Sequence, residues 1–224
     1  MTGERPQPPE LDEAAIQRFS RQILLSEVGG AGQVALRAQR FVLIGAGTAL
    51  STAAAYLAGA GCALSASPRA VRDSEVGFLL SASQVGAPLS ASLAAALPPP
   101  ACGDDHGDAD GRLGELPWQS GDDAHAAAAA FETRGPRVAM GRLRDHADAG
   151  AVAYGAAGAC GDCFGLALAR LQGGLSGVGA VAVGSVAALV AQRLVLKLEG
   201  GVGILVVAPE GPMDLEMERC GRCR

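Results

Sequence analysis

Positive charge is scarce in this chain of 224 residues, and it gathers nowhere into a stripe. Only 18% of the residues are charged, and lysine and arginine (18 together) are outnumbered by aspartate and glutamate (23 together), for a formal net charge of −5. A nucleic-acid-binding surface needs clustered cations. The composition therefore argues against a nucleic-acid partner.

A clear targeting or membrane segment is also missing. Residues 1–13 are polar and acidic and lack a basic head followed by an apolar stretch, so we expect no secretory signal there. Residues 173–191 are uncharged over about the length of a membrane span, but they are rich in Gly, Ala and Ser rather than Leu, Ile and Phe. We interpret them as a buried glycine loop leading into a packed helix over 180–198. We therefore expect a cytoplasmic protein that does not enter the membrane.

Four of the six cysteines form two tight pairs, Cys160 with Cys163 and Cys220 with Cys223. A C-x-x-C spacing lets two thiolates bind one metal ion, and two such knuckles complete a tetrahedral Cys₄ zinc site. The alternatives are redox pairs or disulfides, but two paired knuckles match structural zinc spacing better than a redox motif does, and the pattern fits a reducing cytoplasm. The predicted zinc ion is structural, because four cysteines leave no position for a substrate water. It would clamp the end of the chain to its middle.

The first half of the chain predicts a helix, a strand, a glycine turn and a second helix. Residues 12–25 have the apolar spacing of an amphipathic helix, with Asp12 as its cap and a glycine break at 29–30. Residues 41–44 indicate a buried strand that runs into Gly45 and Gly47, and 48–60 indicate a helix. This strand, turn and helix unit is typical of the start of a nucleotide-binding α/β domain.

The remaining pattern predicts a single α/β domain with an interruption. We expect a second strand over 62–66 and a helix over 85–97, with late strands at 202–208 and 215–218. The composition changes to Pro, Gly and Asp between them, which is typical of a flexible linker. The expected divisions are an N-terminal helical segment (1–30), a nucleotide-binding half (31–97), a linker (98–123) and a C-terminal half with the zinc clamp (124–224).

Several segments resemble the ThiF/MoeB/HesA family, the bacterial relatives of ubiquitin-activating enzymes. Residues 18–25, Arg-Phe-Ser-Arg-Gln-Ile-Leu-Leu, are similar to the family signature R-[YF]-x-R-Q-I-L-L, and 42–47 are similar to its nucleotide turn. Residues 85–88 resemble V-G-x-P-K, 184–188 resemble G-S-[LI]-Q-A, and the last C-x-x-C stands where the family has its second zinc knuckle.

The resemblance implies a fold and an activity. The fold is Rossmann-like, a mainly parallel sheet with flanking helices, here with an N-terminal helical segment and C-terminal strands closed by the Cys₄ knuckle. Family members use ATP and magnesium to adenylate the C-terminal glycine of a small ubiquitin-like carrier protein, and they are usually dimers.

The chain departs from the family at its nucleotide site. The turn G-x-G-G-L-G keeps Gly45 and Gly47 but has Leu50 in place of the third glycine, where close helix-to-strand packing needs a small residue. The acids of the family motif D-x-D fall at Ser65 and Ser67. Further family positions are also changed: the asparagine and arginine fall at Asp73 and Val76, and the lysine of V-G-x-P-K falls at Leu89. The residues therefore do not support ATP and magnesium as cofactors.

The leading hypothesis is a catalytically degenerate member of this family that acts as a binding or scaffold subunit. It would form a homodimer, or a heterodimer with an active homologue, and would bind a ubiquitin-like carrier protein or a peptide tail. Arg21 matches the family arginine that reaches the ATP of the partner subunit, and it is the candidate for such a role in trans.

Two other functions remain open from the sequence. The first is an active adenylyltransferase whose ATP site uses unfamiliar residues, and the nearest charged candidates are Asp73, Glu75 and either Arg69 or Arg72. The second is a nicotinamide or flavin oxidoreductase, which only the glycine turn suggests. The missing acid at the end of the second strand disfavours this class.

Overall fold

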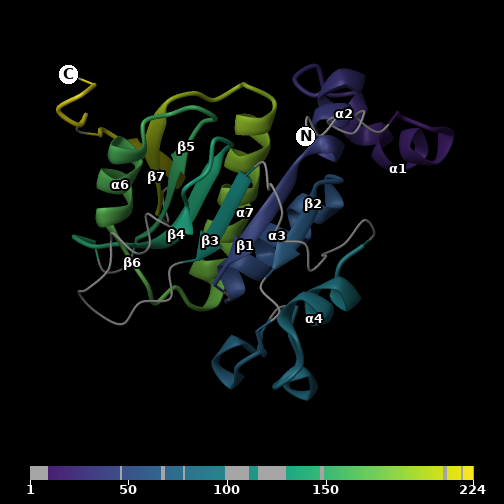
Figure 1. Ribbon diagram of the computed structural model, residues 1–224, viewed down its shortest axis with the longest axis horizontal. Helices are drawn as coiled ribbons and strands as arrows, with labels where there is room; N and C mark the ends of the chain where they lie inside the picture. The colour runs from purple at the N-terminus through teal and green to yellow at the C-terminus, as the bar shows by residue number, and fades with distance from the viewer. Residues whose placement is uncertain are drawn as a thin grey trace, which may run out of the picture.

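One mixed β-sheet organises the protein, with helices on both of its faces (Figure 1). The computed structural model describes residues 10–45, 47–66, 69–77, 79–98, 111–115, 130–146, 149–208, 211–217 and 219–223. Within these residues the sheet has eight strands: seven follow the order β2-β1-β3-β4-β5-β7-β8, and the eighth, β6, pairs with β4 off this path. The predicted α/β fold with flanking helices is therefore confirmed.

The sheet has a parallel half and an antiparallel half. Strands β2, β1, β3 and β4 run parallel, and β5, β7 and β8 extend the sheet antiparallel from β4. Carboxyl ends of parallel strands meet at one edge of a sheet, where α/β proteins bind their ligands. The strand bounds are Arg40–Ile44 (β1), Ala63–Ala66 (β2), Gly111–Glu115 (β3), Arg137–Leu143 (β4), Gly150–Gly155 (β5), Leu171–Gln172 (β6), Val202–Ala208 (β7) and Gly211–Leu215 (β8).

The helices cover the two faces of the sheet unequally. Helices α3 and α7 share one apolar core with the sheet, and α6 belongs to a smaller core on the opposite face (Figure 1). A Cβ atom at Gly184 of α7 would lie 2.8 Å from the Cβ atom of Thr52 in α3, so this glycine permits the close crossing of the two helices. The helix bounds are Glu13–Ile23 (α1), Gly29–Ala38 (α2), Thr48–Gly59 (α3), Leu89–Ala96 (α4), Gly161–Ala169 (α6) and Gly177–Val195 (α7).

Helix α7 is long and apolar enough to cross a membrane by length and composition alone. It instead packs into the larger core through Ala180, Val183, Ala187 and Ala191, all of which are buried. This is the predicted packed helix, which begins three residues earlier in the chain than expected. Burial against α3 and the sheet explains the apolar side chains on this face, while Val178 and Leu189 on the same helix remain exposed.

Local signals placed most of the first half correctly. Asp12 caps α1, since its Oδ1 accepts a hydrogen bond from the Ala15 amide at 2.7 Å, and β1, α3 and β2 lie where the pattern predicts them. The glycine pair at 29–30 does not simply end a helix, because Gly29 takes a left-handed φ of 57° and begins α2. Helix α4 begins at Leu89 rather than at 85, after Pro88.

The predicted linker and one predicted strand need correction. The predicted linker over 98–123 contains β3, a central strand between β1 and β4, while the rest of that segment lies outside the described residues. The last strand in the described residues is β8, Gly211–Leu215, which pairs antiparallel with β7; of the predicted strand over 215–218, Glu216 and Met217 are not in a strand and residue 218 lies outside the described residues. Strand β3 has no apolar run, and its burial comes from neighbours that are distant in the sequence.

Candidate functional site

The glycine turn between β1 and α3 lies at the carboxyl edge of the parallel strands. Gly45 has a φ of 87° and Gly47 a φ of 155°, conformations that favour glycine. A Cβ atom at Gly47 would lie only 2.5 Å from Oε2 of Glu115, the last residue of β3. The turn therefore packs directly against Glu115, which lies within the predicted linker over 98–123.

The Glu115 carboxylate occupies the first turn of α3. Oε2 accepts a hydrogen bond from the Leu50 amide at 2.8 Å, and the Ala49 amide donates to the same carboxylate. The side chain is only 8% exposed. Unpaired amides and the positive end of the dipole make a helix N-terminus an anion site, which is how strand-turn-helix units bind phosphate. In this chain the anion at that position is the protein's own carboxylate.

Burial raises the pKa of Glu115, and the two amide hydrogen bonds, which favour the carboxylate, reduce this shift without reversing it. The folded protein therefore holds the Glu115 proton more tightly than the unfolded chain does. The resulting stability is fully present below the ordinary carboxyl pKa and is lost as the pH rises through the raised folded-state pKa.

This linkage predicts a pH-dependent difference between the wild type and Glu115→Gln, a variant that cannot ionise here. The free energy of unfolding of the wild type should fall relative to that of Glu115→Gln as the pH rises through this window. Urea titrations at a series of pH values measure the difference. A difference that did not change with pH would contradict the raised pKa.

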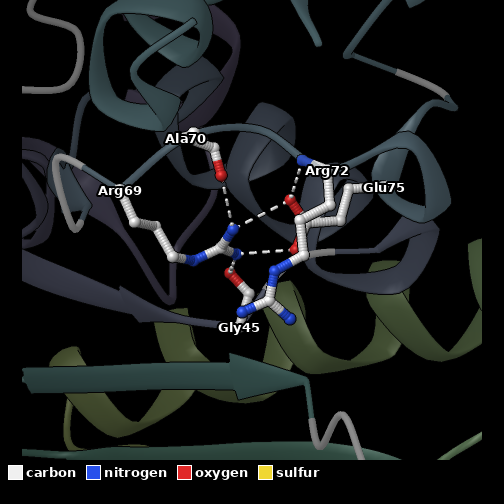
Figure 2. A network of polar contacts seen from close by, with 5 residues as sticks. All are labelled: Gly45, Arg69, Ala70, Arg72 and Glu75. Atoms are coloured by element: carbon white, nitrogen blue, oxygen red, sulfur yellow. Dashed lines mark hydrogen bonds and ion pairs between the residues drawn. The ribbon is translucent and has the colours of Figure 1, made fainter. Parts of the chain in front are cut away.

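An arginine–glutamate pair covers the other side of the glycine turn (Figure 2). Arg69, in the segment after β2, donates through Nη1 to Oε2 of Glu75 at 2.9 Å and lies 2.8 Å from Oε1 through Nη2. The same Nη2 donates to the Gly45 carbonyl at 3.3 Å, and Glu75 also accepts from the Arg72 amide at 3.0 Å. The pair therefore ties the segment after β2 to the turn.

Because Arg69 and Glu75 neutralise each other, the pair offers little net charge to a ligand. Although burial raises the pKa of Glu75, the hydrogen bonds from Arg69 and Arg72 and their positive charges outweigh it and lower that pKa. Arg69 and Glu75 were sequence candidates for a rebuilt nucleotide site, and the structure does bring them to the turn, but paired with each other. The other two candidates, Arg72 and Asp73, have exposed side chains.

Apolar side chains fill the space behind the turn. Leu50 and Leu89, which stand where the family has a glycine and a lysine, are 3% and 2% exposed. The cavity between β1, α3 and α4 has a volume of about 10 Å³, and its lining residues are Leu43, Gly45, Leu50, Ser51, Ala54, Leu80, Leu89 and Leu93. Such a volume holds at most about one water molecule. In the conformation described, these residues do not fit a nucleotide.

The remaining predicted nucleotide-site residues do not form one group in the described part of the chain. Ser65 is buried near the end of β2, and Ser67 lies outside the described residues. Arg21 is exposed on α1, which lies toward the opposite end of β1 from the glycine turn (Figure 1). Any contact between Arg21 and a nucleotide turn would therefore have to involve another chain.

The four predicted cysteine ligands come together at the end of the chain. Their Sγ atoms all lie within 4.8 Å of one another, and those of Cys160 and Cys220 are 3.6 Å apart. Tetrahedral zinc with Zn–S bonds of about 2.3 Å separates its sulfur ligands by about 3.8 Å. None of the four is in a disulfide. The cluster could therefore bind a metal ion such as zinc.

Hydrogen bonds within the cluster shift the pKa values of Cys160 and Cys223 in opposite directions. The Cys163 amide, with the thiols of Cys220 and Cys223, lowers the pKa of Cys160 to about 7. Hydrogen bonds with the other thiols, that to Cys160 foremost, raise the pKa of Cys223 to about 12. The Cys160 thiolate thus forms readily while Cys223 holds its proton. A bound divalent cation would allow all four to ionise.

Solved structures resemble this chain in fold. The crystal structure of E. coli MccB with MccA-N7isoASN has a TM-score of 0.66 and 13% sequence identity, over 95% of this chain and 75% of that one. The structure of PaaA has a TM-score of 0.62 and 15% identity, over 93% of this chain and 84% of that one. At such identities the likeness shows the fold.

Sequence comparisons reach only part of the chain. The "adenylyltransferase and sulfurtransferase MOCS3" of Anopheles gambiae is 48% identical over 52 residues, which are 23% of this chain and 12% of that protein. The protein of the same name from Aedes aegypti is 46% identical over 52 residues. No protein-family model matches the chain. The resemblance to the ThiF/MoeB/HesA family is thus supported by the fold and by one short stretch of sequence.

Proposed function

Starting from the ThiF/MoeB-type fold that this chain shares, we propose that it is a catalytically degenerate relative of these adenylyltransferases. It binds a partner protein and does not activate it with ATP. The observation that carries the proposal is the position of Glu115. Its carboxylate accepts hydrogen bonds from the backbone amides at the start of α3, which a nucleotide phosphate would need as donors. A phosphate would have to displace a hydrogen-bonded anion of the protein itself.

Two further features support the loss of ATP chemistry. The guanidinium of Arg69 is paired with Glu75, so it neutralises a carboxylate of the chain rather than a phosphate. Leu50 and Leu89 fill the space behind the turn. Adenylyl transfer relies on cations that neutralise the developing phosphate charge. In this chain Leu89 stands in place of a family lysine and the charge of Arg69 is already paired, so both the space and the positive charge for a phosphate are reduced.

The four cysteines form the most complete group of candidate ligands among the described residues of the chain. We infer that they hold one structural zinc ion, which Cys160 and Cys163 at the start of α6 share with Cys220 and Cys223. A complete Cys₄ shell has no open position for a substrate. The ion clamps the C-terminal turn onto the fold and takes no part in a reaction.

The partner we infer is a peptide or a small ubiquitin-like carrier protein, or an active homologue of the same fold. This inference draws on MccB, which was crystallised with MccA-N7isoASN, and on the mosquito relatives, which are named adenylyltransferases and sulfurtransferases. A homodimer, or a heterodimer with an active homologue, would place the exposed Arg21 against another chain. Free thiols in a metal-binding cluster favour the cytoplasm as its location.

The alternative function is an active adenylyltransferase with a rebuilt nucleotide site. Its supporting observation is that Arg72 and Asp73, which lie between Arg69 and Glu75 in the chain, are exposed and could meet a ligand. This function requires the Arg69–Glu75 pair to open and the Glu115 carboxylate to leave α3. Two hydrogen-bonded contacts would thus have to break before ATP could enter.

A calorimetric titration of the zinc-loaded protein with Mg-ATP tests the proposal. We expect no measurable heat up to millimolar nucleotide, because the anion position is occupied and the cavity behind it is too small. Circular dichroism on the same sample shows that the protein is folded, and an adenylyltransferase with an intact glycine turn serves as the positive control. Micromolar binding would refute the proposal and favour the alternative.

A further inference from the structure

A buried arginine lies beneath the first cysteine knuckle. Arg137, the first residue of β4, is only 6% exposed. No carboxylate in the part of the chain that the structure describes forms an ion pair with it. A buried cation is costly unless an anion or hydrogen-bond acceptors compensate for it. The position of Arg137 therefore raises the question of what balances its charge.

The contacts of Arg137 direct its guanidinium toward the knuckle. It lies opposite Gly155 of β5 in the sheet, and a Cβ atom at Gly155 would lie 3.3 Å from its Nε, so this glycine leaves room for the arginine. Its Cζ stands 4.9 Å from the centre of the Phe164 ring in α6. Its Nη2 donates a hydrogen bond to the Ala159 carbonyl.

These contacts place the charge next to a metal ligand. Ala159 directly precedes Cys160 in the chain, and a Cβ atom at Gly161, directly after it, would lie 3.8 Å from Nη1 of Arg137. Cys160 is also the group whose charge interacts favourably with Arg137. The guanidinium thus lies against the backbone on both sides of Cys160.

We propose that Arg137 is a positioning residue of the metal centre. It offsets the negative charge of the metal-bound thiolates and fixes the first knuckle through Ala159. Four thiolates around one divalent ion carry a net formal charge of minus two, which a nearby buried cation stabilises. The proposal rests on the zinc site inferred above, and the anion that balances Arg137 is that site.

A purely structural role would look different. Arg144 shows that role in the same chain, because it donates to the carbonyls of Ala169 and Leu171 from an exposed position. There its charge remains solvated and needs no counter-ion. Arg137 makes a similar bond to a carbonyl, but its charge is buried, so the packing of its side chain alone does not explain why the residue is charged.

Zinc affinity in Arg137 variants tests the proposal. Arg137→Met, Arg137→Lys and the control Arg112→Met would be titrated in competition with a chromophoric chelator, with the cobalt-thiolate charge-transfer band as a second signal. Arg112 is the neighbour of Arg137 on β3, but its Nε donates to the Glu132 carbonyl at an exposed site.

We expect Arg137→Met to weaken zinc binding by about 10-fold or more, the scale of changes in groups that support metal ligands. Arg137→Lys should recover most of the loss, because it keeps the charge, and Arg112→Met should match the wild type. Zinc binding as tight as the wild type in folded Arg137→Met would overturn the proposal. So would equal losses in the Lys and Met variants, since the charge would then have no role.

Two controls keep this result separate from the zinc site itself. Metal analysis of the wild type comes first, and a folded wild-type protein without zinc would refute the zinc site and with it this inference. If the wild type holds zinc and only the affinity of the Arg137 variants fails to change, the zinc site stands and the role of Arg137 falls. Should Arg137→Met not fold, Arg137→Gln, which is polar but uncharged, makes the same test.

Discussion

Changing Cys220 to serine is expected to lower the zinc content from one ion per chain to well below one and to release the C-terminal turn. Serine replaces a thiolate, the ligand that zinc prefers at such sites, with a weakly binding hydroxyl. After β8, which pairs only with β7 in the sheet, the metal cluster is the main attachment of the described C-terminal residues. Metal analysis and limited proteolysis would measure the two effects.

The expected stability change is large because the clamp closes a long loop. Cys163 and Cys220 are 57 residues apart, and a permanent cross-link of that length restricts the unfolded chain by about 4 kcal/mol. Cys62→Ala is the matched control, since Cys62 is buried in the main core away from the cluster. It should retain its zinc. A Cys220→Ser variant that still held one zinc ion with an ordered C-terminus would contradict the clamp.

Changing Glu115 to alanine is expected to empty the anion position at α3. Truncation leaves the amides of Leu50 and Ala49 without their acceptor, and such a loss at a helix N-terminus costs about 2 kcal/mol. For a chain of this size the midpoint of thermal unfolding should fall by roughly 6 °C. Thermal unfolding at neutral pH would measure the change.

Inorganic phosphate should partly rescue the Glu115→Ala variant. An anion that binds the vacated amides in the folded protein alone raises its stability by mass action. The midpoint of the variant should therefore rise with phosphate concentration more than those of the wild type and of Glu27→Ala, a control at an exposed glutamate. Equal phosphate effects on all three proteins would show that Glu115 does not occupy an anion site.

Mg-ATP is not expected to bind productively even to Glu115→Ala. Leu50 and Leu89 still fill the space behind the turn, and Arg69 is still paired with Glu75. The carboxylate is thus one of several changes that separate this site from a working one. This is why phosphate, a small anion, is the better probe of the vacated position.

The metal cluster and the first glycine turn could be predicted from the sequence because their signals are local. The spacing of each C-x-x-C pair already allows two ligands to reach one ion, and the strand, Gly45, Gly47 and the helix form one continuous segment. The cap at Asp12 was found for the same reason, since it contacts an amide only three residues away. What remained open was how the two cysteine pairs meet.

The content of the nucleotide site was decided by the tertiary structure. Glu115 lies 65 residues beyond the Leu50 amide to which it binds, and its strand carries one leucine between two glycines, too weak a pattern to predict. Only the parallel pairing of β1 with β3 brings the carboxyl ends of both strands to one edge and so places Glu115 on α3. The sequence by itself therefore determined which residues of the ThiF/MoeB/HesA motifs are missing and which cysteines form the two C-x-x-C knuckles. The side chain that fills the empty position could come only from strand pairing, because that contact joins segments without any local relation.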